Sequence, residues 1–361
     1  MRRGGYGPAL ELLALGLVLT LVPWPERWAE VVYLGALLPA WSAVSSRLVD
    51  AVGVSLSGLL LIALLSLPLL ALALSGRPSL LGVIRLLAYA GGVLALLFPL
   101  TFGLGYRLPP LAEQVATAPS DLRGEALRTT RERVLRSLWS GSAWVRDGPA
   151  KVPAAEFTSR EVMSSASACV AELSRQLRPD APPARLPTRV KWLPAGLMLR
   201  FGFAGVVSPW LLEPHVDAGL PGASATAVAL HEFAHSAGFA AEAEAEAVGL
   251  VAGLECADQR VAYAAALRLA TSLAAALPPG ERAEYQAAWP PVALADARLA
   301  ARAGRRFADP RLTSGATAAY DIYLRSQGEA EGIGEYDRGT ELALALLYSR
   351  DASAEEGPGG P

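Results

Sequence analysis

Residues 231–235 read His-Glu-Phe-Ala-His, an H-E-x-x-H motif that carries the clearest chemical signal in the chain. The chain has only three histidines, His215, His231 and His235, and two of them belong to this motif. In a helix each residue turns by about 100°, so His231 and His235 would share a face and could bind one metal ion. Glu232, beside the first histidine, could accept a proton from a water molecule that the metal activates. The motif therefore predicts a zinc site with Glu232 as the catalytic base.

A catalytic zinc site normally has three protein ligands and one open position, so a third ligand is needed. No histidine follows His235, and the next candidates are the carboxylates of Glu242, Glu244 and Glu246. In a second helix Glu242 and Glu246 share a face, whereas Glu244 points about 200° away from Glu242. All three cannot serve together. Helix geometry leaves the choice between Glu244 and the Glu242/Glu246 pair open.

These residues also have plainer interpretations. Two histidines can cap an apolar helix without binding metal, and alternating Glu and Ala is typical of a solvated helix face. The context favours the metal site, because the motif ends an expected helix at residues 223–235, Gly238 allows the chain to turn, and carboxylates follow. At least one of the three glutamates is expected to be an ordinary surface residue.

The composition indicates a membrane-embedded part. The chain is 52% hydrophobic and 18% charged, whereas about a quarter of the residues in soluble domains are charged. Residues 4–25, 51–75 and 86–106 are apolar runs of roughly the 20 residues that cross a bilayer. Residues 31–46 are apolar but shorter, which favours an interfacial or re-entrant helix. We therefore expect the lipid bilayer to hold about three transmembrane helices.

The chain is expected to divide into a membrane domain at residues 1–106, a catalytic domain at residues 107–350 and a tail at residues 351–361. The tail is acidic and rich in Gly and Pro, which predicts disorder. Arg2 and Arg3 indicate a cytoplasmic N-terminus. Three spans would then place the catalytic domain outside the cytoplasm, on a multi-pass protein of the cell membrane.

Hydrophobic periodicity predicts helices at residues 120–140, 159–177 and 224–277, the last interrupted at Gly238, and strands at residues 188–193 and 197–207. The fold class is therefore α+β, mostly α, with N-terminal transmembrane helices before a domain that has a small sheet and the H-E-x-x-H helix. The strand at 197–207 is either an edge strand that pairs with extended substrate, as zincins use one, or a core strand.

Two other residues have a possible role in the site. His215 falls in a predicted loop, where it could stabilise an oxyanion, although a plain surface-loop histidine is the favoured interpretation. Tyr263, in the predicted helix after the glutamates, is a similar candidate donor but is better explained as a packing residue.

Charge and cysteine content exclude several classes of protein. The net charge of −2 means that the chain has no excess of basic residues with which to bind nucleic acid. Two cysteines, Cys169 and Cys256, are too few for a disulfide-rich scaffold or a four-cysteine zinc ribbon. A transporter is disfavoured because the charges in the predicted spans, Glu11 and Arg85, lie near the span ends.

Four segments resemble a bacterial membrane-protein family catalogued as domain of unknown function 3810. They are HEFAHSAGFAAEAEAEA, LTFGLGYRLPPLAEQ, GLMLRFGFAGVVSPWLLEP and YDIYLRSQGEAEGIGEYDRG, and the resemblance covers most of the chain. The family's hallmark is a zincin-like H-E-x-x-H, a Gly and then E-x-E-A-N. The resemblance implies that Glu244, at the Glu of E-A-N, is the third zinc ligand. Glu246 replaces the Asn of that motif, and Phe102 and Gly105 replace a Trp and an Asn.

The expected function is that of a membrane-anchored zinc metallopeptidase, a hydrolase that cleaves a peptide or protein substrate near the membrane surface. His231, His235 and Glu244 would hold Zn²⁺, and Glu232 would act as the base. The alternative is a catalytically silent zinc-binding sensor or scaffold with a zincin fold. An intramembrane protease is disfavoured, because a long polar-containing segment separates the motif from the apolar runs.

Overall fold

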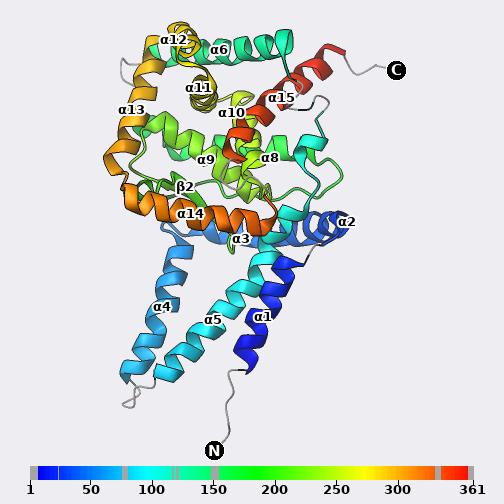
Figure 1. Ribbon diagram of the computed structural model, residues 1–361, viewed down its shortest axis with the longest axis vertical. Helices are drawn as coiled ribbons and strands as arrows, with labels where there is room; N and C mark the ends of the chain where they lie inside the picture. Colours follow the sequence, from blue (N-terminus) through cyan, green and yellow to red (C-terminus); the bar gives the residue numbers. More distant parts are fainter. Residues whose placement is uncertain are drawn as a thin grey trace, which may run out of the picture.

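The computed structural model describes residues 7–22, 24–74, 80–115, 118, 122–147, 154–329 and 335–356. Its helices α1 (Gly7–Leu21), α4 (Leu56–Leu74) and α5 (Leu80–Thr101) extend together away from the rest of the chain, as Figure 1 shows. We call these three helices the stalk. Their large apolar side chains are exposed; Leu60, for example, is 54% exposed and Leu81 is 63% exposed. Such a surface is unusual for a helix that faces water.

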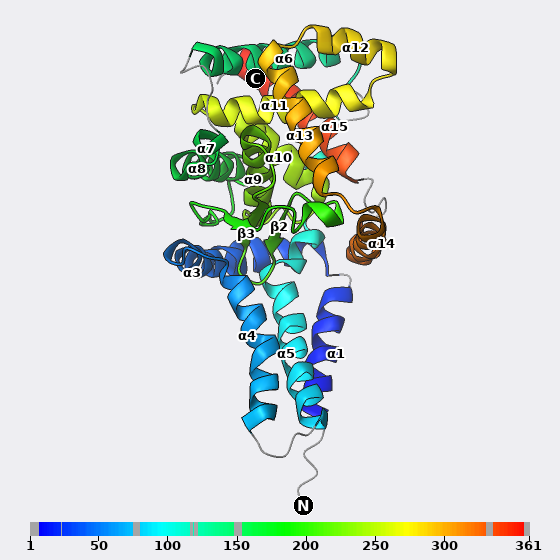
Figure 2. The same cartoon turned by 90° about the vertical axis from the view of Figure 1, so that its left-hand side faces the viewer.

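A second apolar stretch lies across the end of the stalk. It runs without interruption through α2 (Glu26–Trp28), the π-helix η1 (Ala29–Leu37) and α3 (Leu38–Ala51), and is therefore longer than the short helix expected at residues 31–46. Figures 1 and 2 show it between the stalk and the larger helical body. Among the described residues, two helical stretches are long and apolar enough to cross a membrane, Glu26–Ala51 and Leu80–Thr101.

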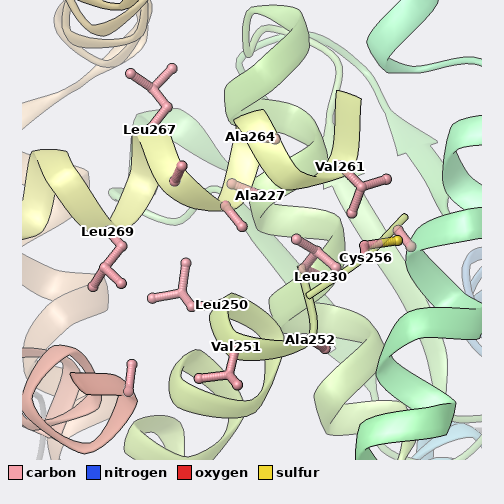
Figure 3. Close-up of a cluster of buried hydrophobic side chains, with 14 of the residues drawn as sticks. Ala227, Leu230, Leu250, Val251, Ala252, Cys256, Val261, Ala264, Leu267 and Leu269 are labelled. Atoms are coloured by element: carbon pink, nitrogen blue, oxygen red, sulfur yellow. The ribbon is translucent and has the colours of Figure 1, made fainter. Parts of the chain in front are cut away.

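The body is built around α9 (Gly222–Ser236), the helix that carries the H-E-x-x-H motif. The helices α8 (Arg160–Leu177), α10 (Glu242–Leu254) and α11 (Gln259–Ala276) pack against it. Outside these lie α6 (Gly124–Asp147) and α15 (Glu335–Glu356). Figure 3 shows the shared core, in which small alanines alternate with larger side chains such as Leu230, Leu250 and Leu269.

Glycine and alanine allow α9 and α10 to approach closely. A Cβ atom at Gly249 would lie 2.9 Å from the carbonyl carbon of Leu230 and 3.0 Å from the amide nitrogen of His231. Only a residue without a side chain fits against backbone at this distance. The contact fixes the start of α10, and therefore its glutamates, relative to the two histidines.

The remaining elements surround this core. They are η2 (Gly103–Arg107), η3 (Leu111–Glu113), α7 (Ala154–Phe157), η5 (Leu199–Phe201), α12 (Pro279–Ala287), α13 (Pro291–Phe307) and α14 (Pro310–Gln327).

A small sheet lies between α9 and the stalk. Its strands β1 (Lys191–Leu193), β2 (Gly205–Ser208) and β3 (Glu213–Asp217) have the order β1-β3-β2. Strand β3 pairs in parallel with β1 and antiparallel with β2, with Val206 opposite His215. Strand β2 is therefore an edge strand.

The sheet differs from its prediction in two places. The strand expected at 197–207 begins only at Gly205, because the carboxylate of Asp217 accepts hydrogen bonds from the amides of Gly196, Met198 and Leu199 and holds that segment in a turn that leads into η5. Residues 213–217, expected as a loop, form the buried central strand.

The helices of the body agree better with the prediction. Helix α8 begins after Ser159, whose hydroxyl accepts a hydrogen bond from the amide of Val162, as an N-cap residue does. The helical region 224–277 is broken at Gly238 as expected, and also before α11, where Asp258 caps the new helix. Helix α15 continues to Glu356, into the tail expected to be disordered, and residues 357–361 lie outside the described residues.

Candidate metal centre

The end of α9 shapes the site around His235. Gly238 has a φ of +89°, and the amide of Phe239 donates to the carbonyl of Ala234 at 3.2 Å. This left-handed turn is a common helix ending that favours glycine. It brings the carbonyl of Phe239 within 2.8 Å of Nδ1 of His235, which donates to it. The imidazole is therefore held with Nε2 facing the other motif histidine.

Three side chains from α9 and α10 converge on one point. Oε2 of Glu242 lies 3.1 Å from Nε2 of His231 and 3.5 Å from Nε2 of His235. Among the described residues these three form a group whose ligand atoms all lie within 4.8 Å of one another. The two imidazole rings stand perpendicular, with centroids 4.6 Å apart.

The spacing of these atoms fits a zinc ion. Ligands at the usual distance of about 2.0–2.1 Å from a tetrahedral zinc stand about 3.3 Å apart, close to the 3.1 and 3.5 Å found here. Oε2 of Glu242 is buried, and the two Nε2 atoms at 3.1 and 3.5 Å are its polar neighbours. A buried carboxylate needs a positive partner, which a protonated His231 supplies without metal and a cation would supply in its place. The donor set of two imidazoles and one carboxylate is one that catalytic zinc sites use.

Neighbouring groups orient these candidate ligands. Nδ1 of His231 donates to Oε2 of Glu246 at 3.1 Å, and Oε1 of Glu246 accepts a hydrogen bond from Arg268 at 2.9 Å. Tyr320, on α14, donates to Oε1 of Glu242. Groups that fix the orientation of a ligand in this way raise its affinity for metal.

Charge balance within the cluster shifts the pKa values of its members. Burial alone would lower the pKa of His231, but the carboxylates of Glu242 and Glu246 outweigh burial and raise it well above its usual value. Burial would likewise raise the pKa of Glu246, yet the charge of Arg268 and the hydrogen bond from His231 lower it to about 2. Without metal, the raised pKa therefore favours the positively charged form of His231, with a proton on each ring nitrogen.

The structure does not bring Glu244, the expected third ligand, to the two histidines. Glu244 points away from the histidines, and its Oε1 accepts a hydrogen bond from the amide of Leu111 at 2.7 Å. Burial raises the pKa of Glu244, and the nearest charge that opposes this belongs to Arg178. Glu242 instead lies beside the histidines and is the candidate third ligand, since Glu242 and Glu246 share the helix face that Gly249 holds against α9.

Glu232 lies beside the ligand cluster, on the same helix. Its Oε2 is buried and accepts no hydrogen bond from the described residues. Burial raises the pKa of Glu232 to about 7. A Cβ atom at Gly205 would stand 2.7 Å from Oε1 of Glu232, so the glycine lets the edge strand β2 pass directly over this carboxylate.

Two cavities meet at His231 and Glu232. One, of about 380 Å³, is lined by the aromatic side chains Phe98, Phe102, Tyr106, Phe203, Trp210, Tyr320 and Tyr323, and we call it the aromatic cavity. The other, of about 340 Å³, is lined by Arg268, Glu246 and the backbone around Gly202, and we call it the Arg268 cavity. The candidate metal ligands and Glu232 are therefore accessible to a bound molecule.

Comparison with known families agrees with the resemblance seen in the sequence. The family described as "Protein of unknown function (DUF3810)" matches residues 33–344 of this chain. The chain belongs to this family. No curated protein and no solved structure matches it.

The other two residues considered in this DUF3810 chain are not among the converging ligand atoms. Tyr263 is buried and donates to Asp296 at 2.7 Å, so it is a packing residue. His215 is buried in β3 rather than exposed on a loop. Its Nε2 lies 2.8 Å from Oγ of Ser55, at the start of α4, and its Nδ1 contacts the carbonyl of Val206 at 3.2 Å.

Sequence reasoning missed Tyr320, which contacts Glu242, and the aromatic residues that come from the stalk. Tyr320 and Tyr323 lie in the segment YDIYLRSQG, three residues apart, a spacing that places both on one helix face. That face is directed at the site, since both tyrosines line the aromatic cavity. Nothing in the local sequence indicates that α14 would approach α10.

Proposed function

We propose that this DUF3810 protein is a membrane-anchored, zinc-dependent metallopeptidase. The observation that carries the proposal is the convergence of His231, His235 and Glu242, whose ligand atoms lie within 4.8 Å of one another, with the buried carboxylate of Glu232 beside them. A purely structural zinc site is normally closed by a fourth protein ligand. Here two cavities reach the ligands, which leaves room for a substrate.

Each residue then has a distinct role in hydrolysis. His231, His235 and Glu242 hold Zn²⁺, which when bound polarises a carbonyl group and makes water a stronger nucleophile. Glu232 accepts a proton from the attacking water, whose hydroxyl adds to the peptide carbonyl carbon. Glu232 then delivers that proton to the amide nitrogen as the carbon–nitrogen bond breaks. Burial raises the pKa of Glu232, and a raised pKa makes a carboxylate a stronger proton acceptor.

The exposed apolar surface of the stalk supports a position in the membrane. Water-facing helices do not normally present contiguous leucines, whereas lipid-facing helices do. We propose that α1, α4 and α5 are embedded in the bilayer and that α2, η1 and α3 lie at its surface, as their crossing orientation in Figure 1 suggests.

The disulfide between Cys169 and Cys256 favours the extracytoplasmic side for the catalytic domain. Disulfides persist in oxidising compartments and are rare in the cytosol. The cysteines are 87 positions apart and join α8 to the end of α10, so the bond also supports the helix that carries Glu242.

The proposal can be tested with the full-length protein in detergent, loaded with zinc and incubated with a library of unstructured peptides. We expect cleavage by the wild type, and loss of cleavage but retention of zinc in Glu232→Gln. If the wild type, with zinc bound, leaves every peptide intact while Glu232→Gln behaves identically, the chain is a zinc-binding protein without this activity.

A further inference from the structure

The edge strand β2 has main-chain groups available for pairing. In an antiparallel ladder, the N–H and C=O groups of every second residue bond to the partner strand, and those of the residues between face away from it. Val207 stands opposite Pro214, which has no N–H to share, so the peptide groups of Val207 and Gly205 face away from β3. Outside the ladder, no hydrogen bond to another described residue engages Gly205 or Val207.

Strand β2 runs from the candidate catalytic residues toward the stalk. Gly205, at its start, lies over Glu232. Trp210, just past its end, donates from Nε1 to the carbonyl of Leu94 on α5 at 2.9 Å. The carbonyl of Trp210 accepts from Nε1 of Trp41 on α3 at 2.8 Å. The C-terminal end of β2 is therefore the end nearest the stalk.

The two cavities lie at different distances from the stalk and differ in their lining. The aromatic cavity includes Phe98 of α5 and Trp210, and so it opens beside the stalk. The Arg268 cavity lies on the other side of Glu232, toward α11, which Figure 2 shows farther from the stalk than β2. The cavity beside the stalk is thus mainly aromatic, whereas the cavity farther from the stalk holds the charged side chains of Arg268 and Glu246.

These observations and the proposed function together set the orientation of a substrate. Extended peptides bind edge strands by main-chain pairing, and antiparallel pairing is two- to three-fold more common than parallel pairing. A peptide antiparallel to β2 places its N-terminal part in the aromatic cavity beside the stalk and its C-terminal part in the Arg268 cavity. We propose that the substrates are polypeptides anchored in the membrane on the N-terminal side of the scissile bond, and that cleavage releases the C-terminal part.

The orientation can be tested with the full-length zinc-loaded protein reconstituted into lipid vesicles together with reporter proteins. The reporters share one cleavable segment, chosen from the peptide library, next to a fluorescent domain. In one reporter a single transmembrane helix precedes the segment, in a second the same helix follows it at the same distance, and in a third there is no helix. Anchoring in the same bilayer raises the local concentration of the first two equally, so their comparison isolates the direction of binding.

We expect the reporter with the preceding helix to be cleaved at least tenfold faster than the other two. Equal or faster cleavage of the reporter with the following helix would overturn the proposed orientation. Equal cleavage of the unanchored reporter would overturn the requirement for a membrane anchor. If no reporter and no free peptide is cleaved, the proposed hydrolase function itself fails, and this inference fails with it.

Discussion

Nδ1 of His231 donates a hydrogen bond to Oε2 of Glu246 at 3.1 Å, while Nε2 of the same ring lies 3.1 Å from Oε2 of Glu242. The two glutamates are one helical turn apart on α10 and so contact opposite sides of one imidazole. Glu246 fixes the ring and keeps Nε2, the nitrogen proposed to bind metal, directed at Glu242. Arg268 in turn fixes Glu246.

Glu246→Gln should weaken zinc binding without abolishing it. Loss of a partner that orients a metal ligand typically lowers metal affinity by about 10–100-fold. Competition with a chelating dye would measure the change. Glu255→Gln is a suitable control, because Glu255 pairs with Arg133 and Arg350 at the far end of α10 and should leave zinc affinity unchanged. Equal affinities in all three proteins would exclude this role for Glu246.

Zinc affinity should fall as the pH is lowered. The carboxylates of Glu242 and Glu246 raise the pKa of His231, so without metal the ring is positively charged. Zinc must then displace the proton on Nε2. If each zinc ion that binds displaces one proton, the apparent zinc affinity should drop by about tenfold for each unit by which the pH is lowered. The same dye competition at several pH values between 6 and 8 measures this slope. An affinity independent of pH over that range would contradict the protonated state inferred for His231.

Glu232→Gln should reduce peptide cleavage by about 10²–10⁴-fold, the usual contribution of a general acid–base residue. Zinc content should stay at the wild-type level, because Glu232 is not among the converging ligand atoms. Cleavage assays and metal analysis on the same preparation check both statements. A variant that keeps full activity would remove Glu232 from the mechanism.

Glu213 should stabilise the junction between the sheet and the stalk. It is buried and accepts hydrogen bonds from the amides of Leu56 and Ser57 at the start of α4. Burial alone would raise its pKa, but hydrogen bonds from His215, Ser57 and Leu56 lower the pKa from 4.5 to about 2. A shift of this size corresponds to at most about 3 kcal/mol of folding stability.

The lowered pKa of Glu213 predicts how its contribution to folding stability depends on pH. Because the folded pKa lies below the unfolded value, the stabilisation is present above about pH 4.5 and is lost as the pH falls toward 2. Glu213→Gln should therefore lower the melting temperature at pH 7, and the difference from wild type should shrink toward pH 3. A difference that is the same at both pH values would show that the charge of Glu213 contributes nothing.

The sequence predicted the local part of the site and missed what depends on packing. The H-E-x-x-H spacing, the break at Gly238 and the shared face of Glu242 and Glu246 follow from helix geometry within α9 and α10. The choice of Glu242 over Glu244 depends on which face of α10 meets α9. That face is set by the contact of Gly249 with the backbone of Leu230, which no local pattern reveals.

Strand β3 was missed for a related reason. Glu213, Pro214, His215 and Asp217 have the composition of a loop, yet all are buried. Their polar groups bond to parts of the chain that are distant in sequence, such as Leu56 for Glu213 and Gly196 for Asp217. Buried polar residues with distant partners cannot be distinguished from exposed ones by their type alone.

The most direct test of the account is the zinc content of two matched variants, Glu242→Gln and Glu244→Gln. Both change one carboxylate near the start of α10, buried at Glu242 and partly buried at Glu244, to an amide of the same shape. We expect about one zinc per chain in the wild type and in Glu244→Gln, because Glu244 contacts Leu111 and not the histidines. Glu242→Gln should lose the metal, since its Oε2 is the third ligand atom in the proposed site. Retention of zinc by Glu242→Gln with loss from Glu244→Gln, or absence of zinc from the wild type, would contradict the metal centre described here.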